Sequence, residues 1–427
     1  MPARTLKMSR VLLLPYDNGM HINYPPLNLA YVASAMIRKG HDVTVVQHDI
    51  YHSETLLRQH LRNNHYDIVG LGACAGYYQY QQIKKLCSLI REISSAKIWL
   101  GGHLVTPEPD YFLKEFNVDW ICEGEYDFTD DLDSLPLPPW NLFDISYYAL
   151  MRLPRCDNND RCFPVLGGRG CPFKCTFCYR MEQGYRAHSI ERILEEVQIL
   201  IRDYHITYID FADELLMTNP DRPVQIAEAL KPLNIKWDCN GRLNYAKPDI
   251  LKKMREAGCV FINYGIESVD DEVLELMNKK LRYDQIIAGV EATLEADISP
   301  GLNIIWGNLG DTRETLWRSV DFLRKYDDHA QLRTIRPVTP YQGSPLYDYA
   351  IEKGLLKGIG DFYEKHKNSD LLTVNFTDLS DDEFHRELYE ANYFLLSDYY
   401  FHQRTNAYKS AKRLYAGDAT FRGFRQT

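Results

Sequence analysis

The 427-residue sequence predicts an α/β fold: an N-terminal doubly wound parallel sheet, a partial (β/α)6 TIM-like barrel and a C-terminal helical region. Short apolar runs alternate with segments whose apolar residues recur at helical spacing, and this alternation occurs in two separate series. The runs are continuous, which is typical of parallel strands that helices cover on both faces. A segment with three prolines, LDSLPLPPW at 132–140, separates the two series.

The first series predicts five strands with a helix between consecutive strands. Strands are expected at 10–15, 42–47, 67–73, 97–102 and 119–124, and helices at 27–40, 53–64, 78–95 and 109–116. Ligands of doubly wound sheets bind at the carboxyl ends of the strands. Four glycines gather there: Gly72, Gly76, Gly101 and Gly102. They either let the backbone approach a flat or bulky ligand or only end the strands, and the spacing leaves both interpretations open.

The second series predicts six strands, each followed by a helix, as in most of a parallel barrel. Strands are expected at 163–168, 206–214, 235–242, 260–268, 299–307 and 331–340, and helices at 189–204, 220–232, 248–258, 270–296 and 312–326. The active end of such a barrel is formed by the carboxyl ends of its strands.

The domain boundaries follow from these two series. We expect a sheet domain at 1–125, an extended linker at 126–162, a barrel at 163–355 and a C-terminal helical region at 356–427. The aromatic segment 384–403 predicts a helix that packs on the barrel. The basic residues beyond about 404 predict a mobile or partner-facing tail.

Three cysteines lie in GCPFKCTFCYR at 170–180, just past the first barrel strand. Three residues separate Cys171 from Cys175, and two separate Cys175 from Cys178. A cubic iron–sulfur cluster needs four ligands, usually thiolates, so three cysteines would leave one iron open to a substrate. Zinc with three protein ligands and a water is the rival interpretation. The 3–2 spacing, the aromatic Phe177 and the place at a barrel mouth favour the cluster.

Polar residues gather at the same predicted end of the barrel. They follow or close successive strands: Asp213 and Glu214, Asn240 and Arg242, Glu267, Asn303, and then Thr339 and Tyr341. Such a set can bind the amino group, carboxylate and ribose of a small zwitterionic nucleoside. The alternative is a set of helix caps and solvated loop residues.

Composition bounds the function further. The formal net charge of −10 argues against nucleic-acid binding through the phosphate backbone. No apolar run approaches the roughly 20 residues that a bilayer helix needs, and the N-terminus lacks a signal-peptide pattern. We therefore expect a cytoplasmic protein without membrane contact, in which ten cysteines do not form structural disulfides. Cys156 and Cys162, which lie just before the cysteine segment, are candidates for additional metal ligands.

At the cysteine segment the sequence resembles the radical S-adenosylmethionine (SAM) enzymes. C-x3-C-x-aromatic-C matches their signature at Cys171, Cys175, Phe177 and Cys178. GGRGCPFKCTFC, DFADELL, GIES and TPYQGSPLYDYAIEKGLL resemble, in this order, one branch of the family. In that branch a cobalamin-binding-like domain of Rossmann type precedes the barrel. The resemblance covers about residues 8–125 and 132–355, and points to the anaerobic magnesium-protoporphyrin ester oxidative cyclases and the cobalamin-dependent methyltransferases.

The resemblance implies the cofactors and their residues. The three cysteines hold a [4Fe–4S] cluster whose open iron takes the amino and carboxylate groups of SAM. Glu214 would bind the amino group, Arg242 the carboxylate and Glu267 the ribose, with Asn240 and Asn303 nearby and the backbone at Phe177 meeting the adenine. Cobalamin would lie at Gly72, Gly76, Gly101 and Gly102. Reductive cleavage then gives methionine and a 5′-deoxyadenosyl radical that takes hydrogen from an unreactive carbon.

The sequence departs from this branch in the loop after the first strand. Histidine-ligated cobalamin domains carry D-x-H-x-x-G there, whereas this loop reads DNGMHINYPP, with His21 four residues after Asp17. We therefore expect cobalamin without a histidine on cobalt.

Three functions remain open from the sequence. The first is cobalamin-dependent methylation of a small molecule, and the second is radical oxidation, cyclisation or rearrangement with or without cobalamin. The third is a zinc or iron–sulfur binding module without radical chemistry. Methylation consumes two SAM molecules and gives S-adenosylhomocysteine besides 5′-deoxyadenosine, whereas oxidation gives no S-adenosylhomocysteine. Both enzyme readings imply an electron donor such as flavodoxin or ferredoxin.

Overall fold

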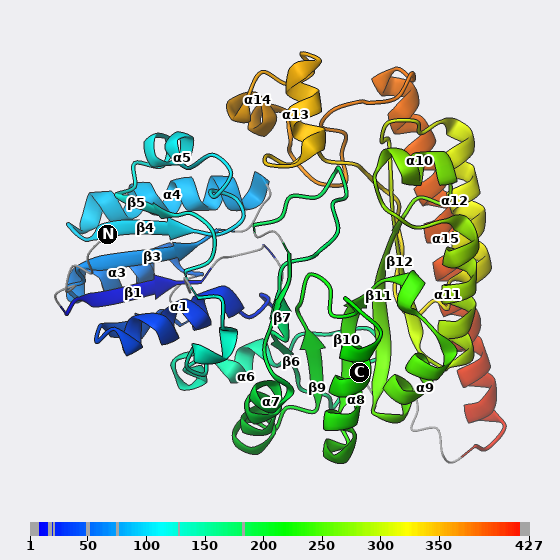
Figure 1. Ribbon diagram of the computed structural model, residues 1–427, viewed down its shortest axis with the longest axis horizontal. Helices are drawn as coiled ribbons and strands as arrows, with labels where there is room; N and C mark the ends of the chain where they lie inside the picture. The colour runs from blue at the N-terminus through cyan, green and yellow to red at the C-terminus, as the bar shows by residue number, and fades with distance from the viewer. Residues whose placement is uncertain are drawn as a thin grey trace.

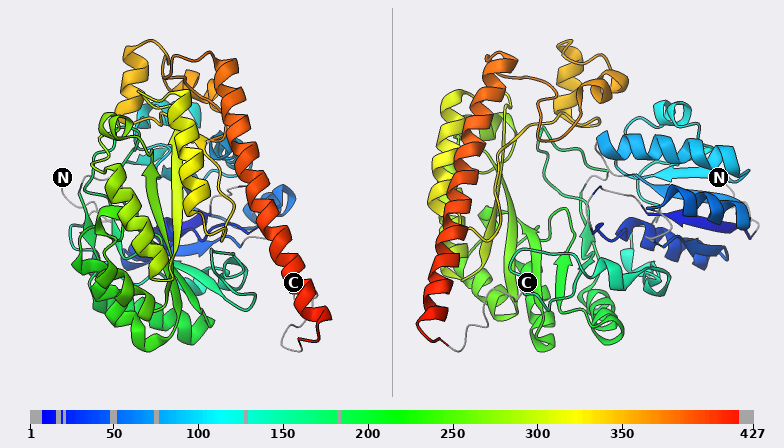
Figure 2. Two further views of the ribbon diagram at one scale, coloured as in Figure 1. Left: turned by 90° about the vertical axis from the view of Figure 1, so that its right-hand side faces the viewer. Right: turned by 180° about the vertical axis from the view of Figure 1, so that it is seen from behind.

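The structure is a computed structural model that describes residues 8–15, 19, 22–47, 52–73, 77–126, 129–181 and 184–418. An N-terminal sheet and a half-barrel lie next to each other, and a long helix runs along the outer side of the half-barrel (Figures 1 and 2). The predicted fold class is confirmed. Within the described ranges, no helix has the length and apolar character needed to cross a bilayer.

The N-terminal sheet has the strand order β2-β1-β3-β4-β5, and all neighbours are parallel. The chain order reverses between β1 and β3, which is where doubly wound sheets bind ligands. The elements are β1 (Arg10–Leu14), β2 (Asp42–Val45), β3 (Ile68–Gly72), β4 (Lys97–Gly101), β5 (Trp120–Cys122), α1 (Leu27–Arg38), α3 (Glu54–Asn63), α4 (Tyr77–Ile93) and α5 (Pro109–Glu115). The five predicted strands and four predicted helices are all present.

The two faces of this sheet are covered unequally. Helices α3, α4 and α5 bury one face, whereas α1 covers only part of the other. In the described ranges no α-helix follows β5 before residue 145, and Trp99 of β4 and Trp120 of β5 lie side by side on this face. Their rings meet edge to face with centroids 4.9 Å apart. This uncovered half-face leaves a hollow next to α1.

The segment predicted as an extended linker is packed instead. It forms the 3-10 turns η1 (Leu132–Ser134) and η2 (Trp140–Leu142) and the short helix α6 (Ile145–Tyr148). Trp140 and Phe143 are buried, and the Trp140 ring meets Phe163 of the first barrel strand at 5.0 Å. The prolines exclude regular structure here, while the large apolar side chains fix the segment between the two sheets.

The half-barrel sheet has the order β13-β12-β11-β10-β9-β6 and is parallel throughout. The six predicted strands are confirmed, although the last is short because Pro337 and Pro340 carry no N–H for strand pairing. The strands are β6 (Cys162–Val165), β9 (Tyr208–Phe211), β10 (Lys236–Gly241), β11 (Cys259–Glu267), β12 (Ser299–Trp306) and β13 (Arg336–Pro337). The helices are α7 (Ile190–Tyr204), α8 (Asp221–Leu230), α9 (Pro248–Glu256), α10 (Asp271–Leu276), α11 (Tyr283–Glu295) and α12 (Arg313–Tyr326).

The C-terminal region contacts both halves of the molecule. Helices α13 (Pro345–Glu352) and α14 (Ile359–Lys365) pack on the N-terminal domain, where Tyr363 stacks on Tyr80 of α4 at 4.2 Å. Helix α15 (Asp381–Tyr415) runs along α12, and its buried apolar contacts end at Leu395. The helix continues where a tail was predicted beyond 404. The domain boundary at 355 stays a prediction.

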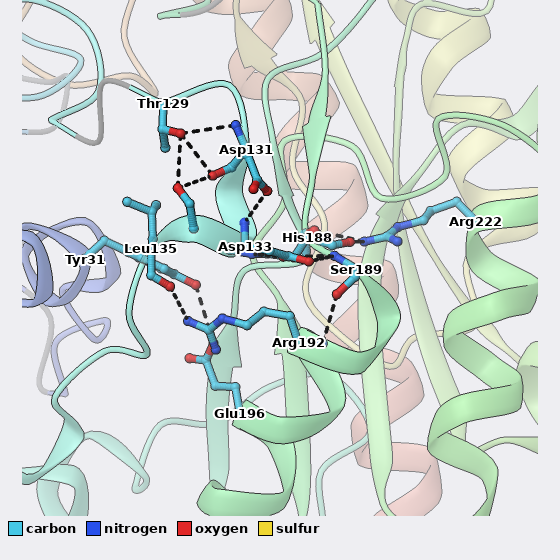
Figure 3. A network of polar contacts seen from close by, with 12 residues as sticks. Tyr31, Thr129, Asp131, Asp133, Leu135, His188, Ser189, Arg192, Glu196 and Arg222 are labelled. Carbon is cyan, nitrogen blue, oxygen red and sulfur yellow. Dashed lines mark hydrogen bonds and ion pairs between the residues drawn. The ribbon is translucent and has the colours of Figure 1, made fainter.

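A polar network ties the packed linker to α7 (Figure 3). The Asp133 carboxylate accepts a hydrogen bond of 3.1 Å from the backbone N–H of Ser189 at the start of α7. Deeper in the helix, the buried Glu196 accepts from Tyr31 Oη at 3.4 Å and from Trp140 Nε1 at 3.2 Å. Burial raises the pKa of Glu196 to about 7, because the ionised carboxylate would lose its hydration.

Glu196→Gln is expected to flatten the pH dependence of stability. A carboxyl with a raised pKa binds its proton more tightly in the folded chain, so its contribution is full below pH 4.5 and is lost as the pH rises through about 7. Between pH 5 and pH 8 the free energy of unfolding of the native chain should therefore fall by about 2–3 kcal/mol relative to that of the variant. Thermal unfolding followed by tryptophan fluorescence measures this shift. Parallel pH profiles of the two proteins would contradict the burial account.

Candidate active site

The three cysteines lie in the loop between two short strands, β7 (Gly168–Arg169) and β8 (Arg186–Ala187), beyond the carboxyl end of β6. The strands pair antiparallel and close the base of the loop. Thr176 anchors its centre: the N–H donates to the carbonyl of Met277 and the carbonyl accepts from the N–H of Leu346, both at 2.9 Å. The barrel and α13 therefore hold the cysteine loop from two sides.

The loop borders a cavity of about 1060 Å³ at the carboxyl ends of the barrel strands. Every residue that the family resemblance assigned to the cluster or to SAM lines it, whereas Asp213, Thr339 and Tyr341 of the predicted polar set do not. The assigned residues are Cys171, Cys175, Cys178, Phe177, Glu214, Asn240, Arg242, Glu267 and Asn303. They come from the loop after β6 and from β9, β10, β11 and β12 or their ends, which parallel strands bring to one edge.

The cysteines sit in an environment that disfavours bare thiolates. Burial raises the pKa of Cys178 to about 12, and the neighbouring Cys175 and Glu214 act in the same direction. Burial also raises the pKa of Cys171. Three thiols this close together and this dehydrated suit a positively charged metal centre, which stabilises thiolates on binding. The donor set therefore fits a cluster ligand set.

A row of asparagines crosses the floor of the cavity. Asn303 Nδ2 donates to Asn263 Oδ1 at 2.7 Å, and Asn263 Nδ2 donates to Asn240 Oδ1 at 2.9 Å. Asn240 Nδ2 donates in turn to the carbonyl of Asp213 at 2.7 Å. The row spans β12, β11, β10 and the end of β9 and locks each amide in one orientation. Asn263 was not predicted, because it lies within a strand and not at its end.

Arg242 supports the cysteine loop. Its guanidinium donates to the carbonyls of Lys279 and Lys280, the latter at 2.9 Å, and lies 3.7 Å from the centroid of the Phe173 ring. Burial lowers the pKa of Arg242, and the nearby Cys175 counteracts this effect. Its Nε has no hydrogen-bond partner within the described ranges. A buried donor of this kind on the cavity wall suits an anionic ligand.

Lys279 brings a second cation into the cavity, one that sequence reasoning missed. Its Nζ lies 3.1 Å from Oε1 of Glu267, and both side chains are largely buried. Glu267 has a positive φ of 71° at an irregularity in the β11–β12 pairing. The run NKKLR around Lys279 is typical of a solvated surface, so the sequence carried no signal for this residue.

His103 was also missed, although it follows the predicted glycine pair at the end of β4. Its Nε2 lies 3.9 Å from Oε1 of Glu214, and its ring meets Tyr179 edge to face at 6.1 Å. The N-terminal domain therefore contributes a side chain to the barrel cavity. A polar residue directly after a strand-end glycine is the signal that could have found it.

The hollow on the N-terminal sheet is a cavity of about 730 Å³. Gly72, Gly101 and Gly102 line it together with apolar residues of α1 and the Trp99 and Trp120 side chains. A Cβ at Gly102 would stand 2.2 Å from the carbonyl oxygen of Ala73, so this glycine is needed for strand packing itself. The atoms nearest to a Cβ at Gly72 would belong to the Leu29 side chain, the first at 3.4 Å. Gly76, Asp17 and His21 lie outside the described residues.

A third cavity of about 650 Å³ lies between the two domains. It shares Asn28 and Glu125 with the N-terminal hollow, and it shares His103 and Glu214 with the cysteine cavity. Glu125 forms a largely buried ion pair with Arg169 of the barrel. The carboxyl ends of the two sheets thus face one another across a common space.

Cys156 and Cys162 do not join the other three cysteines. Cys162 begins β6, at the end of the strand opposite the cavity, and packs with Met151 and Tyr208. Cys156 packs against the same cluster. Their suggested role as extra ligands finds no support in this placement.

Family models match both halves of the chain. Residues 165–323 match the radical SAM superfamily, and residues 21–130 match the B12 binding domain. An uncharacterised methyltransferase of Pyrococcus horikoshii is 29% identical over 380 residues, which are 78% of this chain and 80% of that protein. The anaerobic magnesium-protoporphyrin IX monomethyl ester cyclase of Cereibacter sphaeroides is 28% identical, over 42% of this chain and 30% of the cyclase.

Solved structures share the fold. The radical SAM methyltransferase TsrM of Kitasatospora setae, with cobalamin and a [4Fe–4S] cluster bound, has a TM-score of 0.66 at 15% identity. The match covers 81% of this chain and 75% of TsrM. The cobalamin-dependent radical SAM enzyme OxsB has a TM-score of 0.61 at 18% identity, covering 87% of this chain and 57% of OxsB.

The N-terminal doubly wound sheet faces a half-barrel that carries three cysteines at its mouth. This is the arrangement of an α/β enzyme with two cofactor-binding domains. The chain is a radical SAM enzyme with an N-terminal B12-binding domain. Its cofactors are a [4Fe–4S] cluster, SAM and cobalamin, as predicted.

Proposed function

We propose that this enzyme transfers a methyl group from SAM to an unreactive carbon of a small-molecule substrate, with cobalamin as the methyl carrier. The observation that carries the proposal is the space between the domains, whose lining residues Glu125, His103 and Glu214 also line the two cofactor cavities. A substrate in this space has access to both. The relatives named as methyltransferases support methylation, and the match to a cyclase keeps radical oxidation as the second candidate.

In this proposal Cys171, Cys175 and Cys178 hold the cluster, and the barrel cavity binds SAM. Glu214 takes the amino group, because its carboxylate stands at the end of β9 beside the cysteines. Lys279 and Arg242 together bind the SAM carboxylate. Arg242 already donates hydrogen bonds to two backbone carbonyls, so fewer of its N–H groups are left for the ligand. The amide row of Asn240, Asn263 and Asn303, together with Glu267, faces the ribose. Phe177 borders the adenine.

Cobalamin in this proposal occupies the N-terminal hollow. The cavity fits because Gly72 carries no side chain next to Leu29 of its wall and its walls are mostly apolar, which suits a large flat ring system. Gly76 stays a predicted cobalamin contact, and cobalt without a histidine ligand stays the prediction from the sequence.

The chemistry of the cluster and of the cysteines suggests an electron donor and a cellular compartment. The cluster needs one electron at low potential, for which we propose flavodoxin or ferredoxin as donor. The nine cysteines of the described residues form no disulfide with one another, which suits a reducing cytoplasm. We retain the domain limits 1–125, 163–355 and 356–427, with the packed linker at 126–162.

Glu214→Gln is expected to weaken SAM binding by about 10–100-fold, because the ligand's ammonium group loses a charged partner in a partly dehydrated cavity. Equilibrium binding to the anaerobic, cluster-loaded enzyme measures the effect, and iron content reports that the cluster is intact. Glu195→Gln, an exposed glutamate on α7, serves as the matched control. Equal affinity in Glu214→Gln and the control would remove Glu214 from the SAM site.

The function itself is tested by products. The reduced enzyme with cluster and cobalamin, incubated anaerobically with SAM, should form S-adenosylhomocysteine, and the cobalamin-free enzyme should not. 5′-Deoxyadenosine should form in both cases. Formation of 5′-deoxyadenosine alone, with cobalamin bound, would refute methylation and favour oxidation or rearrangement.

A further inference from the structure

A second group of metal-binding side chains lies far along the sequence from the cysteine loop, where α15 meets the loop after α12. It consists of His329, Asp398 and His402, and one ligand atom from each lies within 4.8 Å of the other two. His329 Nε2 and Asp398 Oδ2 are 3.1 Å apart, and the two imidazole rings are stacked with centroids 3.7 Å apart. None of these residues lines the cavities described above.

The local fold positions all three side chains. Asp398 and His402 are four residues apart on α15, so they occupy the same face of the helix one turn apart. His329 adopts a left-handed backbone with φ of 57°. Its N–H donates to Asp327 Oδ1 at 3.1 Å, and its carbonyl accepts from Gln403 Nε2 at 3.3 Å. The first hydrogen bond lies within the loop, and the second fastens the loop to α15 at Gln403.

Among the described residues, the other charged side chains nearby pair with one another, and the Asp398 carboxylate pairs with histidine. Arg333 pairs with Asp327 at 2.5 Å and with Asp328 at 3.4 Å. Asp328 also pairs with Arg155 at 3.7 Å, so the two acidic residues that precede His329 are balanced by two arginines. His329 is the one ion-pair partner of Asp398 found in the described ranges. Two imidazoles and one carboxylate remain in contact at a partly exposed surface.

We propose that His329, Asp398 and His402 bind a divalent transition-metal ion, with Zn²⁺ as the ion that the donor set suits best. Two imidazoles and a carboxylate, completed by water, form a common zinc ligand set, whereas Mg²⁺ and Ca²⁺ prefer oxygen ligands throughout. Ligand atoms on tetrahedral zinc are about 3.3 Å apart, so the group closes around the ion through rotation of the exposed His402 side chain.

The site has a mechanical consequence. Buried apolar contacts of α15 end at Leu395, and the helix continues to Tyr415 with largely exposed side chains. A zinc ion at Asp398 and His402 fastens this second half of the helix to the loop between α12 and β13. Ion binding thus strengthens the contact that α15 makes with this loop beyond Leu395 through Asp398 and Gln403.

The experiment uses the anaerobic enzyme with its cluster and cobalamin loaded, so that the three cluster cysteines are occupied. Chelator-buffered Zn²⁺ is titrated by calorimetry, and X-ray absorption at the zinc edge identifies the ligands. One Zn²⁺ per chain with nitrogen and oxygen ligands is expected. His329→Gln and His402→Gln should each weaken binding at least about 10-fold, and Asp398→Asn should do the same.

His385→Gln is the matched control, because His385 is an exposed histidine on the same helix outside the group. It should bind Zn²⁺ like the native chain, and unchanged iron content should show that all variants are folded. Absence of Zn²⁺ binding, sulfur ligands in the absorption spectrum, or equal affinity in His402→Gln and His385→Gln would each overturn the proposal.

Discussion

Replacement of any one of Cys171, Cys175 and Cys178 by alanine is expected to reduce SAM cleavage by more than about 1000-fold. A cubic cluster with three protein ligands has no replacement for a lost thiolate, because its fourth iron is reserved for SAM. The structure brings all three cysteines to one cavity wall and raises the thiol pKa of Cys171 and Cys178 through burial.

The measurement is 5′-deoxyadenosine formation after anaerobic reconstitution, together with iron analysis. The native chain should hold about four irons, and each variant should hold fewer or an altered cluster. Cys156→Ala is the matched control, because Cys156 lies with Cys162 away from the cavity. Stoichiometric zinc without iron in anaerobically purified native protein would show that the cysteine assignment is wrong.

Val32→Trp is expected to lower cobalamin retention at least 10-fold while the cluster stays intact. Val32 lies on α1 and lines the N-terminal hollow opposite Trp99 and Trp120. An indole side chain there fills space that the cofactor needs, and a loss of about 1.4 kcal/mol already gives a 10-fold effect. Formation of S-adenosylhomocysteine should fall with cobalamin content, whereas 5′-deoxyadenosine formation should continue.

The control for this prediction lies on the same helix. Ile37 is 42% exposed and does not line the hollow, so Ile37→Trp introduces the same side chain without filling the cavity. Absorption of the protein after reconstitution with hydroxocobalamin measures occupancy. Full occupancy in Val32→Trp would place cobalamin elsewhere in the molecule.

The sequence predicted the two sheets because most of their strands read as continuous apolar runs. It also predicted which residues meet at the barrel mouth, because the carboxyl ends of parallel strands share one edge. Cys178, Glu214 and Asn303 are far apart in the chain but line one cavity for this reason.

Other features left no local signal. Lys279 stands in a charged run that is typical of surfaces, and only the fold turns its side chain toward Glu267. Asn263 joins the amide row through cross-strand neighbours that the sequence alone does not pair. The linker was predicted as extended because prolines dominate it, whereas the burial of Trp140 depends on a surface that two domains form together.

The central claim is that the two sheets present their cofactors to one space, through the shared lining residues Glu125, His103 and Glu214. Electron paramagnetic resonance of the anaerobic enzyme tests this claim without a substrate. The spectrum of Co(II) cobalamin is recorded with the cluster oxidised and then reduced, since only the reduced cluster is paramagnetic. The account predicts that the Co(II) signal broadens through dipolar coupling when the cluster is reduced. A spectrum that is the simple sum of the two isolated signals would contradict it.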